Sequence, residues 1–146
     1  MDVRINGAWV SPSRAQVRIG NAWRTVTRAQ AYIGGAWRTI ATFTPPLTLS
    51  LSATSVSGFS FGGTVFTNNV TVTPSGGQAP YTYAWALSSG DGEISYPTAA
   101  TTNFYDTPGI EVTTSGQFIC TVTDALGSIA VSDPVTATFF DYGGAS

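Results

Sequence analysis

The stretch VRIGNAWRTVTRAQAYIGGAWRTI, residues 17–40, contains nearly the same phrase twice, and VRINGAWV at residues 3–10 contains it once before. The tryptophans of the three copies lie fourteen residues apart, at Trp9, Trp23 and Trp37. Helical and propeller-blade repeats need roughly 20–50 residues each, so fourteen is too short for them. A fourteen-residue period suits a strand, a turn and a second strand, and it predicts three β-hairpins over residues 1–43.

Each copy has a pair of turn residues at the same phase: Asn6-Gly7, Gly20-Asn21 and Gly34-Gly35. These residues tolerate the positive φ angles that a two-residue hairpin loop requires. A two-residue loop also sets the strand register. One face of each hairpin is then mostly small and aliphatic. The other face has a cross-strand pair, which is Arg4–Trp9, Arg18–Trp23 or Tyr32–Trp37.

The hairpin arm needs a partner for its apolar surface. A lone two-stranded hairpin is marginally stable in water. The hairpins must therefore pack on each other, on copies of themselves, on the chain's own second domain or on another protein. Trp and Arg often anchor protein interfaces, which favours packing between molecules. The candidate partner-binding residues are Trp9, Trp23, Trp37, Arg4, Arg18, Arg24, Arg38 and Tyr32.

Charge is divided unevenly along the chain. All six basic residues are Arg within the first 40 positions, while seven of the eight acidic residues follow residue 90. The arm therefore carries about +5 (six Arg less Asp2) and the remainder −7, which suggests two parts with different partners. The Arg residues alternate with apolar ones and form no basic run. This pattern favours a protein interface and predicts no nucleic-acid partner.

The composition changes after the arm, at the TPP of residues 44–46, which predicts a stiff, extended joint. Short β-rich segments closed by turn residues follow at the spacing of a sandwich. The sequence thus predicts an all-β chain with a hairpin arm at 1–43 and an antiparallel β-sandwich at 47–140. Residues 141–146 are expected to form a flexible tail.

Two landmarks of the second domain resemble immunoglobulin and PKD-like sandwiches. Trp85 stands where the core Trp of the third strand would be, and FIC at residues 118–120 resembles the Tyr-x-Cys of the sixth strand. The pattern is incomplete, because Val70 or Val72 replaces the partner Cys and Phe118 lacks the hydroxyl of a tyrosine corner. We expect a structural core containing Trp85, Phe118 and Cys120, with Cys120 as a buried small hydrophobe.

Few residues could support catalysis. The chain has no His and no Lys, so the commonest general bases and Schiff-base donors are missing, and no cluster of Cys and His could hold zinc. Asp91 and Glu93, with Asp106 and Glu111 further on, could serve glycoside hydrolysis or bind calcium, or simply lie solvated in loops. We predict no enzymatic activity, no metal and no cofactor.

Two further patterns bear on binding and location. Five aromatic residues could form a sugar-binding face or lie in the core: Tyr81, Tyr83, Tyr96, Phe104 and Tyr105. The N-terminal segment has no apolar region typical of a secretory signal, and no stretch approaches the roughly 20 apolar residues of a membrane span. We therefore expect synthesis in the cytoplasm and no membrane insertion.

The arm phrases VRIGNAWRTV and AYIGGAWRTI resemble the short repeats of tail, fibre and other minor virion proteins of tailed bacteriophages. The predicted sandwich is similar to domains appended to phage capsid, decoration and tail proteins. This resemblance implies a non-enzymatic structural protein of the virion, made in the host cytoplasm. Its arm would bind other virion proteins or copies of itself, forming a homo-oligomer, and its sandwich would project outward for weak adhesion to host surface glycans.

Two other interpretations remain open. The chain could be a carbohydrate-binding or adhesive module of a bacterial surface protein, or a small glycosidase. The missing export signal argues against the first, and the sparse carboxylates argue against the second.

Overall fold

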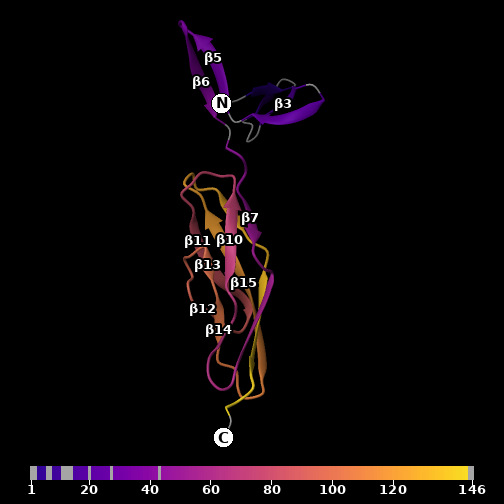
Figure 1. Cartoon of the computed structure of the whole chain (residues 1–146). Coiled ribbons are helices and arrows are strands. Elements are labelled where there is room, and N and C mark those ends of the chain that lie inside the picture. Colours follow the sequence, from indigo (N-terminus) through magenta and orange to yellow (C-terminus); the bar gives the residue numbers. More distant parts are fainter. Residues whose placement is uncertain are drawn as a thin grey trace. The chain divides into compact units, whose positions relative to one another are not determined.

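The computed structural model describes residues 3–5, 8–10, 15–19, 21–26, 28–42 and 44–144. The chain forms two compact units, Met1–Pro46 and Leu47–Ser146 (Figure 1). The described residues form strands and no helix, which confirms the predicted all-β class. Accordingly, this part of the chain has no helix long and apolar enough to cross a membrane.

The first unit contains three hairpins, each a separate two-stranded antiparallel sheet. Their strands are β1 (Val3–Ile5) with β2 (Ala8–Val10), β3 (Ala15–Ile19) with β4 (Ala22–Val26), and β5 (Arg28–Ile33) with β6 (Ala36–Thr42). The register confirms the expected cross-strand pairs, which are Arg4–Trp9, Arg18–Trp23 and Tyr32–Trp37.

The turn of the third hairpin follows the prediction. Gly34 and Gly35 have φ angles of 61° and 81°, the left-handed conformation that a two-residue hairpin loop needs. Asn6, Gly7 and Gly20 of the other two turns lie outside the described residues. The register of the third hairpin shifts between Ala29 and Gln30, so the regular alternation of faces applies to its outer part.

The second unit is a β-sandwich of two main sheets. One sheet has the order β13 (Thr101–Thr102), β10 (Val70–Ser75), β7 (Thr48–Leu51). The other has the order β11 (Thr82–Gly90), β15 (Thr113–Thr123), β17 (Val135–Asp141), β8 (Ser55–Ser60), and β16 (Ile129–Val131) also pairs with β15. A small third sheet has the order β12 (Glu93–Ile94), β14 (Phe104–Asp106), β9 (Val65–Phe66).

The entering segment of the sandwich changes sheets. Strand β7 pairs antiparallel with β10, whereas β8, which follows directly, pairs parallel with the last strand β17 in the opposite sheet. Gly58 allows β9 to lie close to β8, because a Cβ at this position would lie 2.1 Å from the carbonyl oxygen of Phe66. Side chains alternate between the two sides of a strand, so the inward residues of both sheets meet in one core.

Three aromatic rings lie at the centre of that core. Trp85 packs edge-on against Phe104 with ring centroids 5.7 Å apart, and Phe104 stacks on Phe118 at 4.0 Å. The indole nitrogen of Trp85 donates a hydrogen bond of 3.0 Å to the carbonyl oxygen of Ala99. Cys120 belongs to the same buried cluster, as do the two valines at the position of the missing Cys, Val70 and Val72.

The packed domain extends beyond residue 140. Strand β17 ends at Asp141, whose side chain is 2% exposed, and Tyr142 donates its backbone N–H to the carbonyl oxygen of Ser60. Residues 141–143 thus hold a defined place in the fold, although the sequence placed them in a flexible tail. The reason is that the Asp141 carboxylate has backbone partners in loops distant in the sequence.

Candidate functional site

The third hairpin carries an exposed aromatic pair. The rings of Tyr32 and Trp37 meet edge to face with centroids 5.5 Å apart. Their side chains are 63% and 69% exposed, and Ile33 on the opposite face is 51% exposed. Both faces of this hairpin therefore offer apolar surface to a partner.

The third hairpin also has two exposed arginines. Arg28 opens β5, and Arg38 lies opposite Ala31 on the aliphatic face. The hairpin thus combines aromatic rings with positive charge, a composition enriched at interface anchors. For Arg4, Trp9, Arg18, Trp23 and Arg24 the structure gives the strand register, while their side chains lie outside the described residues.

The sandwich has a second exposed aromatic surface, here called the aromatic patch, formed by Phe59, Phe61, Phe140 and Tyr142. Phe61 stacks on Tyr142 with centroids 5.4 Å apart, and Phe140 meets Tyr142 edge-on at 4.3 Å. Phe59 contacts both Phe61 and Tyr142 at about 6 Å. Phe59, Phe61 and Tyr142 are more than half exposed, so the patch is a surface feature and not part of the core.

A buried carboxylate holds the patch together. Asp141 accepts hydrogen bonds from the backbone N–H groups of Gly62 at 2.7 Å, Gly63 at 3.2 Å and Gly143 at 2.8 Å. Hydrogen bonds from Gly143 and from the Gly62–Gly63 loop lower the pKa of Asp141 and outweigh the opposing effect of burial, so it is anionic at neutral pH. The loops that carry Phe61 and Tyr142 are thereby fixed to one anchor.

A matching carboxylate organises the other end of the sandwich. Burial of Asp124 would raise its pKa, but hydrogen bonds from the backbone of Ser128, Gln78 and Leu126 outweigh burial and lower it. A Cβ built at Gly77 would meet both Asp124 and Leu47, so Asp124 lies where the chain enters the sandwich. The aromatic patch lies at the opposite end, where Phe140 pairs with Thr113 at the start of β15.

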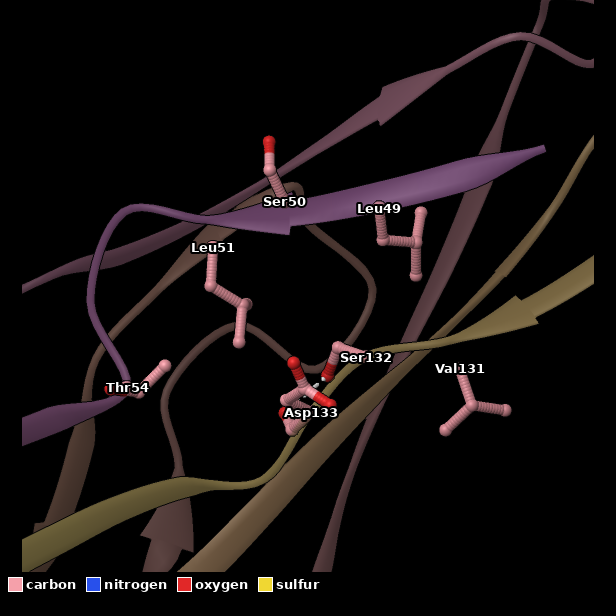
Figure 2. Close-up of a pocket in the computed structure, with 7 residues that line it drawn as sticks. All are labelled: Leu49, Ser50, Leu51, Thr54, Val131, Ser132 and Asp133. Atoms are coloured by element: carbon pink, nitrogen blue, oxygen red, sulfur yellow. Dashed lines mark hydrogen bonds between the residues drawn. The ribbon is translucent and has the colours of Figure 1, made fainter.

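A shallow hollow lies where the entering strand changes sheets (Figure 2). Its volume is about 260 Å³, and its lining comes from residues 49–51, Thr54 and residues 131–133. The Ser132 hydroxyl is fully engaged, because it accepts from the Cys120 N–H and donates to the Asp133 carbonyl oxygen, each at 2.9 Å. The polar side chains of the lining come from Ser50, Thr54, Ser132 and Asp133.

The acidic residues are dispersed. Glu93 accepts a hydrogen bond from the Tyr105 hydroxyl, which raises the pKa of Tyr105, and Asp106 accepts one from Thr114. Asp91 lies in the turn after β11, where its backbone N–H donates to the Ser115 carbonyl oxygen. Among the described residues, no three His, Cys, Asp or Glu side chains gather closely enough to hold a metal ion.

The five candidate sugar-binding aromatics do not form one face. Phe104 is fully buried, and Tyr81 and Tyr83 are half-buried against the core. Tyr105 packs beside Phe66 with ring centroids 5.5 Å apart, and Tyr96 is 62% exposed. The exposed rings that do gather are those of the aromatic patch. Sequence reasoning did not single them out, although FSF at 59–61 and FFDY at 139–142 carry the signal.

The lone cysteine, Cys120, lies in the core of the sandwich. Cys120 is fully buried, and burial raises the pKa of its thiol to about 11, against the weaker opposing effect of a backbone hydrogen bond from Ala84. The thiol is therefore protonated at neutral pH and shielded from reagents.

No protein-family model matches the chain, and no curated protein matches it significantly.

Proposed function

We propose that this chain is a non-enzymatic structural protein of a phage virion, associated with the tail or fibres or decorating the capsid. In this proposal the hairpin arm anchors the chain to other virion proteins or to its own copies, and the sandwich projects outward. The observation that carries it is the exposed Tyr32–Trp37 pair on a hairpin with tight glycine turns.

The exposed apolar surface of the third hairpin supports an anchoring role. Tyr32, Trp37 and Ile33 expose more than half of their side chains on the two faces of one hairpin. Burying apolar surface is worth about 25 cal/mol per Å², so an assembly that covers these faces gains stability. The register repeats a cross-strand pair with Trp in all three hairpins. If all three pairs contact the partner, the linked contacts strengthen one another.

A particle-incorporation experiment tests the proposal. The full chain with Trp23→Ala and Trp37→Ala is supplied to assembling particles, and purified particles are probed for it by mass spectrometry. We expect the variant to be lost from the particles while its sandwich unfolds at the wild-type temperature. Tyr96→Ala, which removes an exposed ring of the sandwich, is the matched control. Unchanged incorporation of the double variant would overturn the anchoring role.

A second candidate is a carbohydrate-binding or adhesive role for the sandwich. The gathered, exposed rings of the aromatic patch favour it, because sugars pack on aromatic faces. A glycan array probed with the full chain and with Phe61→Ala tests it. Binding that is lost in the variant would support adhesion, and absence of binding in the wild type would count against it.

A further inference from the structure

We propose that the aromatic patch is the acceptor for the hairpin arm of a second copy of this chain, so that copies join arm to patch. The inference rests on the proposed function in taking the arm as an assembly device, and it adds the partner and its binding site. The patch suits a docking role because its rings are exposed while their loops are fixed by Asp141.

The charges of the two units are complementary, which favours the arm of a second copy as the partner of the patch. Every basic residue of the chain lies in the arm, and the sandwich has seven acidic residues and no basic one. Next to the patch lies the exposed Glu111, whose backbone N–H donates to the carbonyl oxygen of the buried Asp141 at 2.7 Å. An arm of another copy therefore meets opposite charge at this end of the sandwich.

The side-chain chemistry also matches. Arg stacks on aromatic faces, and a cation–π contact strengthens when it is desolvated. The third hairpin exposes Arg38 and Ile33 on its aliphatic face, and the patch exposes Phe61 and Tyr142. Such a contact would bury the exposed apolar surface of both partners at once.

An arm-to-patch contact joins two different surfaces. Such heterologous interfaces produce rings where the rotation closes and open chains where it does not. One chain therefore needs both an intact arm and an intact patch to continue the assembly.

The test uses the full chain and measures its mass in solution by light scattering. Two variants remove the two sides of the contact: Arg28→Gln with Arg38→Gln in the arm, and Phe61→Ala with Tyr142→Ala in the patch. We expect oligomers for the wild type and for the control Tyr96→Ala, and single chains for both double variants. Because salt screens the exposed charges but not the buried apolar contact, added salt should weaken the wild-type oligomers without abolishing them.

Mixing the two variants separates contacts between copies from contacts within one chain. The arm variant keeps its patch and the patch variant keeps its arm, so the mixture should form dimers although each alone is monomeric. A mixture that remains monomeric would overturn the proposal, as would a monomeric wild type or a patch variant that keeps the wild-type mass. Thermal melting of each variant shows that its sandwich is folded.

The outcomes also separate this inference from the proposed function. If the patch variant keeps its oligomers and enters particles while the Trp23→Ala, Trp37→Ala variant does not, the arm has another acceptor and only the present inference fails. If the patch variant keeps its oligomers but loses binding to surface glycans, the patch is a sugar-binding surface and the inference is likewise overturned.

Discussion

Trp37 in the arm and Trp85 in the sandwich illustrate how differently the two units use the same residue. Trp37 is 69% exposed and contacts Tyr32, which lies only five positions away in the chain. Trp85 is 5% exposed and packs against Phe104, with Cys120 opposite it in the register of β15. The third hairpin is built from local contacts that leave surface uncovered, whereas the sandwich is built from distant contacts that cover it.

This difference has a thermodynamic consequence. A two-stranded hairpin removes little apolar surface from water and depends on its turn and on outside partners. A sandwich removes the inner faces of both sheets from water at once, so its stability comes from the core. The arm and the sandwich should therefore respond to different substitutions.

The largest expected effect is that of Trp85→Ala. Truncation of this core ring leaves a cavity and an unpaired Ala99 carbonyl oxygen, and it should lower the free energy of unfolding by about 3–5 kcal/mol. Urea denaturation followed by circular dichroism measures it. Trp37→Ala is the matched control and should leave the midpoint of the sandwich transition unchanged. An equal loss in both variants would contradict the contrast drawn between the two tryptophans.

A smaller loss is expected for Asp141→Asn. The native state lowers the pKa of Asp141, so this carboxylate stabilises the fold above its unfolded pKa of about 4 and loses that contribution as the pH falls through the lower native value. The variant should be less stable at pH 7 and should lose less stability on acidification below about pH 4. Thermal melts across this range, with the exposed Asp133→Asn as control, measure both effects. Parallel pH profiles for wild type and D141N would contradict the assignment.

In the arm, a substitution in the Gly34-Gly35 turn should destabilise the third hairpin. Gly35 has a φ angle of 81° and open space where a Cβ would lie, so Gly35→Ala meets only backbone strain, about 1–2 kcal/mol. The change should speed hydrogen exchange of the β5 and β6 amides and leave the sandwich amides unaffected. Gly35→Asn is the control, because Asn tolerates this conformation better than Ala. Equal exchange in wild type and G35A would show that the turn does not limit the hairpin.

The smallest effect is expected for alkylation of Cys120, which should not occur in the native protein. Burial raises the pKa of this thiol to about 11, so iodoacetamide at pH 8 should modify the chain only in denaturant. The stability that depends on the neutral thiol is present below its unfolded pKa of about 8.5 and is lost as the pH rises towards 11. Rapid labelling of the native chain, followed by mass spectrometry, would place Cys120 outside the core.

The sequence by itself determined the local structure. A fourteen-residue period and paired turn residues predicted the hairpin pairs Arg4–Trp9, Arg18–Trp23 and Tyr32–Trp37, because a two-residue loop leaves one register. The all-β class followed from alternation and turn spacing, and the resemblance to immunoglobulin and PKD-like sandwiches implied the core position of Trp85. The hairpin pairs depend on residues that are close in the chain.

Only the tertiary structure decided the features built from distant segments. The aromatic patch needs Phe59 and Phe61 beside Phe140 and Tyr142, about 80 residues further on, and it exists because β8 pairs in parallel with β17. The same pairing brings the Asp141 carboxylate within hydrogen-bond distance of the Gly62 and Gly63 N–H groups. The first residues of the expected tail are therefore packed against the sandwich. No local pattern specifies which strands become neighbours, because that choice depends on how the whole core is buried.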